Sequence, residues 1–248
     1  MNSLLSVRNL SKRFGALRAS DGVDFEVSEG ETLAIIGPNG AGKTTLISQL
    51  AGNLRPDAGV IRFAGEDITE LSAPKRSRKG FARSFQITSI FPEFTALENV
   101  ALAVQAHAGH SFRFWQAARE DASLTRPART ILGEVGLHDR TDIPASSLSH
   151  GEHRQLEVAM ALATKPRLLL LDEPMAGMGI EESKRMIALL ASLKGRLTII
   201  LVEHDMDAVF RLADRISVLV YGRIIATDTP EKIKMNQEVR TAYLGEDA

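Results

Sequence analysis

A glycine-rich loop between an apolar run and a helix-forming run limits the possible folds of this chain more than any other part of its sequence. The loop matches the pattern G-x-x-x-x-G-K-[ST], with Lys43 and Thr44 at its end. Leu33–Ile36 precedes it as a short apolar strand, and Thr44–Leu50 follows as a helix that ends at Gly52. In such a loop the backbone N–H groups point inward, and together with the positive end of the helix they bind a polyphosphate.

The loop therefore predicts a phosphate site in which two side chains have defined roles. We expect Lys43 to reach the β- and γ-phosphates, and the Thr44 hydroxyl to bind Mg²⁺, a hard cation that prefers oxygen ligands. The alternative is a glycine-rich turn that matches the pattern by chance. The residues expected to line the site are Gly37, Pro38, Asn39, Gly40, Ala41, Gly42, Lys43, Thr44 and Thr45.

The loop alone does not separate kinases, GTPases and transport ATPases. A GTPase would normally carry an Asn-Lys-x-Asp motif that reads guanine, and this sequence does not contain one. Phe14 lies upstream of the loop on an early β segment. Its position predicts equally an aromatic ring that stacks on adenine or an ordinary core residue.

Two acids follow a continuous apolar run later in the chain. Leu168–Leu171 has the composition of a central parallel strand, which is buried on both faces, and it ends in Asp172 and Glu173. Ligands of such sheets bind at the carboxyl ends of the strands, so both acids should reach the phosphate loop. We expect Asp172 to hold Mg²⁺ and Glu173 to orient or deprotonate the attacking water. Alternatively, both are solvated residues of a strand-to-loop turn.

A histidine follows the next apolar run in the same way. His204 comes after Thr198–Val202, so it should also lie at the carboxyl edge of the sheet. There its ring could contact the γ-phosphate and respond to hydrolysis. The alternative is a structural or surface histidine.

The pattern of runs outside these motifs favours an α/β fold. Leu4–Val7 and Val23–Val27 have strand length, and residues 91–148 carry a helical rhythm. Strands and helices then alternate, which predicts a parallel sheet with crossover helices. The expected elements are a helix at His153–Ala163, a strand at Leu168–Leu171, a helix at Glu181–Leu193, a strand at Thr198–Val202, a helix at Met206–Ala213, and a hairpin of Ile216–Val220 and Ile224–Ala226.

Composition excludes several classes of protein. The 248 residues include no cysteine, which rules out disulfides, thiolate zinc sites and cysteine nucleophiles. The formal charge of −1 argues against a general nucleic-acid binder. No run reaches the ~18–20 apolar residues of a membrane span, and no signal peptide is present, so we expect a cytoplasmic protein.

A short motif before the expected helix at His153–Ala163 identifies the class. The motif is Leu148-Ser149-His150-Gly151-Glu152, which resembles the Leu-Ser-Gly-Gly-Gln signature of the ATP-binding cassette family, the ATPase subunits of ABC transporters. Ser149 and Glu152 also have the spacing of a capping box, which is the purely structural alternative. The resemblance implies that this site binds the γ-phosphate held by a second, facing subunit.

The sequence departs from the family pattern at two residues of the signature and in one later segment. His150 replaces the first glycine of the signature, and Glu152 replaces the glutamine. An ionised Glu152 close to a phosphate would weaken binding, whereas one turned back into the helix cap would not, and we favour the cap. The segment after Pro174 reads Met175-Ala176-Gly177-Met178 in place of the common Ser-Ala-Leu-Asp.

These departures are similar to one importer branch of the family, which takes up branched-chain and other hydrophobic amino acids. The segments that carry this similarity are Asp172–Met178, Val202–Met206 and the tail Arg240–Glu246. The irregular insert His107–Pro127 is similar to the longer of the branch's two ATPase subunits. Importers of urea and short amides share the branch. The class motifs would also fit a lipopolysaccharide-exporter ATPase or an ABC ATPase without a transport role.

The resemblance implies a P-loop NTPase core with a mainly parallel sheet, an N-terminal antiparallel β subdomain and an inserted helical subdomain. We expect one ABC ATPase domain in three parts, 1–90, 91–148 and 149–248. The implied catalytic residues are Glu173, His204 and Gln86, with Thr44, Gln86 and Asp172 as Mg²⁺ ligands. Phe14, the phosphate loop, Ser149, Gly151 and Glu152 would bind ATP.

The resemblance also implies partners. These are a second ATPase subunit, identical or paralogous, two transmembrane permease subunits and, through them, a periplasmic or extracellular solute-binding protein, with no nucleic acid. The chain would then lie on the inner face of the plasma membrane. We expect the apolar segment Ile87–Phe94 to help form the groove for a permease helix, and the basic run Lys75–Lys79 to be a solvated loop, or alternatively to face lipid headgroups.

Overall fold

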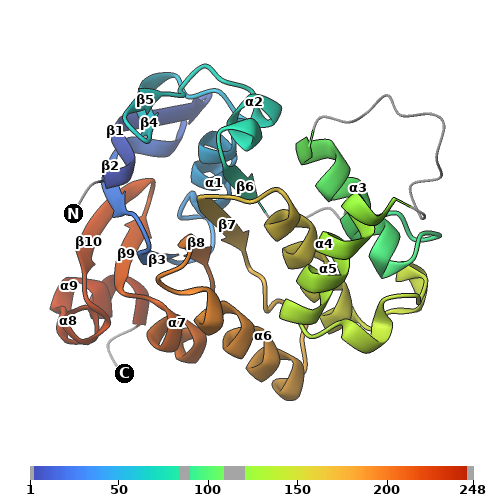
Figure 1. Ribbon diagram of the computed structural model, residues 1–248. Helices are drawn as coiled ribbons and strands as arrows, with labels where there is room; N and C mark the ends of the chain where they lie inside the picture. Colours follow the sequence, from blue (N-terminus) through green and yellow to red (C-terminus); the bar gives the residue numbers. More distant parts are fainter. Residues whose placement is uncertain (1–2, 84–89, 109–120, 245–248) are drawn as a thin grey trace. The chain divides into compact units, whose positions relative to one another are not determined.

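The computed structural model describes residues 3–83, 90–108 and 121–244 (Figure 1). The chain forms two compact units that alternate along the sequence. The first contains Met1–Arg76, Leu170–Glu173 and Leu193–Ala248, and the second contains Ser77–Leu169 and Pro174–Ser192.

An antiparallel sheet forms the N-terminal part of the first unit. Its strands follow the order β2-β1-β4-β5. Every second residue of β2 from Val23 to Val27 is buried, which is the pattern of a sheet with one face in the core. The predicted strands are confirmed but extend further than their apolar runs. The bounds are β1 Ser3–Phe14, β2 Leu17–Ser28, β4 Ala58–Phe63 and β5 Glu66–Asp67.

The second sheet of this unit follows the order β10-β9-β3-β8-β7. Strand β3 is parallel to both β8 and β9, and β10 returns antiparallel beside β9. All residues of β3, β7 and β8 are buried, as expected for strands covered on both faces. The bounds are β3 Thr32–Ile36, β7 Leu168–Asp172, β8 Thr198–Val202, β9 Arg215–Val220 and β10 Arg223–Asp228.

Helices complete the core of the first unit. Ala34 and Ile36 of β3 pack in one cluster with Val209 of α7, Ile233 of α8 and Val239 of α9. The predicted hairpin and the predicted helix after β8 are therefore confirmed, whereas the helices after β10 were not expected. The bounds are α1 Lys43–Ala51, α7 Met206–Leu212, α8 Pro230–Met235 and α9 Gln237–Val239, followed by a π-helical turn at Arg240–Leu244.

The second unit is mainly helical, as predicted. Helices α3, α4 and α5 pack against one another (Figure 1). The Gly80 carbonyl accepts from the N–H groups of Arg167 and Leu168, so β6 lies beside the start of β7. The bounds are β6 Phe81–Arg83, α3 Ala96–Ala108, α4 Ala122–Glu134, 3-10 turns at His138–Arg140 and Ala145–Ser147, α5 His150–Ala163 and α6 Ile180–Leu193.

The structure corrects two expectations. The insert predicted to be irregular as far as Pro127 is helical from Ala122 onward, because Asp121 caps α4 and Pro127 is tolerated inside it. The basic run predicted to be a loop forms helix α2, Ala73–Arg78, and its Arg76 is buried. The Arg76 guanidinium donates to the carbonyl oxygens of Gln49 and Leu50 at the end of α1.

The described ranges contain no helix with both the length and the apolar character that crossing a bilayer requires.

Candidate functional site

The glycine-rich loop connects β3 to α1 and lies tightly against its neighbours in the first unit. A Cβ at Gly37 would collide with the carbonyl oxygen of Leu219, and one at Gly42 would collide with that of Ala19. The Gly222 N–H donates to the Ala41 carbonyl at 2.8 Å. Close backbone approach therefore requires glycine at these two positions of the loop, which argues against a chance match to the motif.

Lys43 points back across its own loop. Its Nζ donates to the carbonyl oxygens of Gly37 and Pro38 at 2.6 and 3.0 Å. Burial lowers the pKa of Lys43, and the charges of Glu173 and Asp172 partly oppose this effect. Gly42 is the N-cap of α1 and brings no side chain to cap it, so a phosphate fits both the ammonium and the positive end of the helix.

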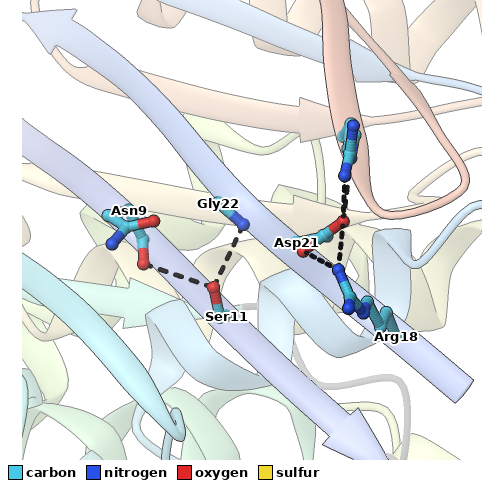
Figure 2. A network of polar contacts seen from close by, with 6 residues as sticks. Asn9, Ser11, Arg18, Asp21 and Gly22 are labelled. Atoms are coloured by element: carbon cyan, nitrogen blue, oxygen red, sulfur yellow. Dashed lines mark hydrogen bonds and ion pairs between the residues drawn. The ribbon is translucent and has the colours of Figure 1, made fainter. Parts of the chain in front are cut away.

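A polar network holds the sheet behind the loop (Figure 2). Asp21 accepts from Arg18 at 3.2 Å and from Arg223 at 2.6 Å, and its N–H donates to the Gly222 carbonyl. The hydrogen bond from Arg223 is the largest cause that lowers the pKa of Asp21. On the neighbouring strand, the Ser11 hydroxyl donates to Asn9 and accepts from Gly22 (Figure 2). These bonds connect β1 and β2 with the turn between β9 and β10. Gly222 of that turn is hydrogen-bonded to the glycine-rich loop.

Asp172 and Glu173, the two acids predicted to follow the apolar run, lie in different environments at the end of β7. Asp172 is only 5% exposed, whereas the Glu173 side chain is 34% exposed. Glu173 has φ of 49°, in the left-handed region that residues other than glycine rarely adopt. Its N–H donates to the Val202 carbonyl of β8 at 2.8 Å. This backbone conformation turns Glu173 away from the strand that precedes it.

His204 lies at the same edge of the sheet, as predicted. Its Nε2 is 2.7 Å from Glu173 Oε1. The two side chains are therefore within hydrogen-bond distance of each other. The His204 N–H donates to Glu203, and Asp205 caps α7, so the histidine is fixed between β8 and the helix.

Phe14 ends β1 and is 50% exposed. Lys12 Nζ lies 5.8 Å from the centroid of its ring. The alternative of an ordinary core aromatic is therefore wrong, because half of this residue is exposed.

Mg²⁺ commonly binds through one or two protein oxygens together with waters and substrate phosphates. Asp172 and the exposed Thr44 supply oxygens of this kind in the first unit. Within the described ranges no group of three or more His, Cys, Asp or Glu residues could hold a metal by itself. The donor set therefore fits a cation that arrives with a polyphosphate. Gln86, the other expected ligand, lies outside the described residues.

The signature motif lies in the second unit, at the start of α5. The Ser149 hydroxyl accepts from the Glu152 N–H, and the Glu152 carboxylate accepts from the Ser149 N–H, which completes the predicted capping box. Arg140 donates to the other oxygen of Glu152 at 2.7 Å. Partial burial raises the pKa of Glu152, but the Ser149 N–H and Arg140 outweigh it and hold that pKa below its ordinary value. Glu152 is therefore an ionised cap.

His150, one of the departures in the signature, contacts the departing segment that follows Pro174. His150 is the first residue of α5, and its Nε2 lies 3.0 Å from the Ala176 carbonyl. Gly177 has φ of 77°, and a Cβ there would lie 3.1 Å from the His150 ring. A glycine in the later segment thus makes room for the histidine in the signature.

Sequence reasoning missed Glu182, which contacts the signature serine. The Ser149 hydroxyl donates to Glu182 Oε1 at 3.1 Å. Two consecutive acids in the first turn of α6 indicate only a helix start, and no local pattern links them to Ser149.

Comparisons with known proteins agree with this geometry. A family model described as ABC transporter matches residues 20–176. A second, described as branched-chain amino acid ATP-binding cassette transporter, matches residues 223–248. Both matches lie in segments from which the sequence motifs were drawn.

Curated relatives match over nearly the whole length. The high-affinity branched-chain amino acid transport ATP-binding protein BraF of Pseudomonas aeruginosa is 40% identical, with 98% of each chain covered. The corresponding protein LivG of Escherichia coli strain K12 is 39% identical, again with 98% of each covered. Neither relative carries a large part that this chain lacks.

A solved structure has the same fold. The ADP conformation of MJ1267, an ATP-binding cassette of an ABC transporter, matches with a TM-score of 0.87 at 30% identity. The match covers 99% of this chain and 100% of that one. The predicted fold, with its antiparallel β part, mainly parallel sheet and helical part, is confirmed.

Proposed function

The chain belongs to the ABC transporter family, and from this premise we propose that it is the ATP-hydrolysing subunit of an importer for branched-chain or other hydrophobic amino acids. The full-length similarity to BraF and LivG carries the transport assignment, and the C-terminal match supports the substrate class. The contact between Glu173 and His204 at the edge of the sheet carries the assignment of hydrolysis.

In this proposal the first unit binds ATP through the residues of its loop. Phe14 stacks on adenine, and Lys43 exchanges its bonds to the Gly37 and Pro38 carbonyls for bonds to phosphate oxygens. Thr44 and Asp172 would hold Mg²⁺, which would supply positive charge beside the phosphates.

Glu173 acts on the attacking water. Its carboxylate accepts the water's proton, and His204 fixes the carboxylate through the contact between Nε2 and Glu173 Oε1. The His204 ring would also contact the γ-phosphate and so respond to hydrolysis. The side-chain amide of Gln86 contacts Mg²⁺ or the attacking water in this proposal.

A second ATPase subunit completes each site. Ser149 and Gly151, at the start of α5, bind the γ-phosphate held by that subunit, and Glu152 keeps the helix end in shape. The pair, either two copies of this chain or this chain and a paralogue, closes on two ATP molecules and acts on two permease subunits at the inner face of the membrane. A solute-binding protein delivers the amino acid to the permeases.

Replacing Glu173 tests this proposal. Glu173→Gln keeps the shape of the site but removes the base, so ATP should still bind while steady-state hydrolysis falls at least about 10²-fold. ATP should then trap a stable dimer, which size-exclusion chromatography with light scattering detects. The control is Glu181→Gln, an exposed acid paired with Lys184 on α6, which should hydrolyse like wild type. Hydrolysis by Glu173→Gln at the wild-type rate would refute the assigned base.

A further inference from the structure

The hydroxyl expected to bind a phosphate is already engaged within its own unit. Glu182 is the third residue of α6, and its Oε1 accepts from Ser149 Oγ at 3.1 Å. Its Oε2 accepts from the Gly179 N–H at 3.3 Å. One carboxylate therefore bridges the start of α6 and the start of α5.

The same carboxylate covers the bare face of Gly151. A Cβ on Gly151 would lie 2.6 Å from both Cδ and Oε1 of Glu182. The N–H of Gly179 and then the Ser149 hydroxyl are the largest causes that lower the pKa of Glu182, each larger than the opposing effect of burial. The Gly151 N–H and the charge of Arg185 lower that pKa further. Glu182 is thus ionised near neutral pH and meets both groups that the signature offers to an anion.

The other acid of the motif lies elsewhere. Glu152 uses its oxygens on the Ser149 N–H and on Arg140, so it holds the cap. Glu182 reaches the hydroxyl of Ser149 and the side of Gly151 that has no Cβ. An incoming phosphate would need these latter groups, and it would meet the negative charge of Glu182 first.

We propose that Glu182 is an internal placeholder for the γ-phosphate, which occupies the signature of α5 until ATP on the facing subunit displaces it. The inference rests on the proposed function, because it assumes that the signature receives that phosphate. Displacement needs only a side-chain rotation, since Oε2 can stay on Gly179 and preserve the start of α6 while Oε1 leaves Ser149. Glu182 thereby sets the ATP concentration at which the pair closes.

The test measures ATP-driven dimerisation in the Glu173→Gln background, where closed dimers accumulate. Glu182→Gln removes the charge but keeps an oxygen for Gly179. The ATP concentration for half-maximal dimerisation should fall about 2- to 5-fold, the size of an interaction between a carboxylate and a helix N-terminus. Glu181→Gln removes the same charge from the neighbouring exposed position and should leave that concentration unchanged.

A second variant and a second readout keep the test decisive. Glu182→Asp keeps the charge but shortens the side chain away from Ser149, and it should also lower the ATP requirement. Binding of a fluorescent ATP analogue to the monomer should be equal in all variants, because its loop lies in the first unit. An unchanged or raised ATP requirement in Glu182→Gln, or tighter binding by its monomer, would overturn the placeholder. If the Glu173→Gln parent itself failed to dimerise with ATP, the proposed function would fail instead.

Discussion

At the scale of single residues, one backbone turn gives two neighbouring acids different environments. Asp172 ends β7 in the core, and Glu173 leaves the strand with φ of 49° and meets His204. A residue held in this region costs on the order of 1–3 kcal/mol, and such strain persists where the surrounding structure demands it. The hydrogen bond from the Glu173 N–H to the Val202 carbonyl of β8 is one of the contacts that hold this conformation.

His150 and Gly177 should depend on each other. Gly177→Ala should lower the free energy of unfolding by about 1–2 kcal/mol, because alanine is strained at positive φ. Its Cβ would also press on the His150 ring at 3.1 Å. Thermal and denaturant unfolding of the single variants and of Gly177→Ala with His150→Gly measures the coupling.

Gly179→Ala is the matched control for that cycle. A Cβ at Gly179 meets nothing within 4 Å, so this variant should unfold like wild type. The loss at Gly177 should be smaller in the His150→Gly background, since only the backbone strain remains there. Equal losses in both backgrounds would contradict the contact.

The sequence predicts local contacts at this scale better than distant ones. The capping box of Ser149 and Glu152 follows from their spacing of three, and the structure confirms it. The contact between Ser149 and Glu182 joins residues 33 apart, and only the fold brings them together. The contact between His150 and Ala176 escaped prediction for the same reason.

At the scale of elements, the predictable parts are those whose apolar pattern decides their structure. The wholly apolar runs that became β3, β7 and β8 are such cases, and so is the helix that ends at Gly52 in a left-handed C-cap. Helix α2 was missed because its sequence is short and basic. Its fold depends on the burial of Arg76 against the end of another helix, which no local pattern displays.

Arg76 should be a main support of the end of α1. It is 1% exposed and donates to the carbonyl oxygens of Gln49, Leu50, Leu71 and Thr69. Burial lowers its pKa to about 10, so it stays charged at neutral pH. Arg76→Ala should lower the free energy of unfolding by about 2–3 kcal/mol, because buried carbonyl groups lose charged donors.

The measurement is denaturant unfolding followed by circular dichroism. Arg78→Ala, which removes an exposed arginine from the same helix, should change the midpoint little. A loss of equal size in both variants would show that the charge of α2, and not the buried bonds, supports the fold.

At the scale of the whole molecule, the two helix ends proposed to bind phosphate belong to different units. The loop and α1 belong to the first unit, and the start of α5 belongs to the second. If each end serves a different nucleotide, one copy of the chain cannot complete a site alone. This division agrees with the proposed closure of two subunits on two ATP molecules.

The second unit also carries the exposed part of the segment expected to meet a permease. Residues 84–89, which include Gln86 and the start of that segment, lie outside the described residues. Phe91 and Phe94 are 51% and 39% exposed, and their ring centroids are 5.3 Å apart. A joined aromatic pair at the surface is suited to binding an apolar helix.

Phe91→Ser should therefore weaken assembly without impairing the isolated subunit. Affinity purification from membranes of the source cells should recover two hydrophobic permeases with the wild-type chain and at least about 10-fold less with the variant, as for the loss of an aromatic anchor. ATP hydrolysis by the isolated subunit should stay unchanged. Met235→Ser, at another exposed apolar position, should recover the permeases normally. Recovery of ribosomes or DNA in their place would contradict the transport assignment.

The conformation of Glu173 also bears on how this protein can be engineered. Glycine and asparagine tolerate φ of 49° better than glutamate, so replacing Glu173 with either would relieve its backbone. The same exchange removes the proposed base. Selection for thermal stability alone would therefore favour replacements of Glu173 that abolish ATP hydrolysis. Stability and turnover must be selected together at this position.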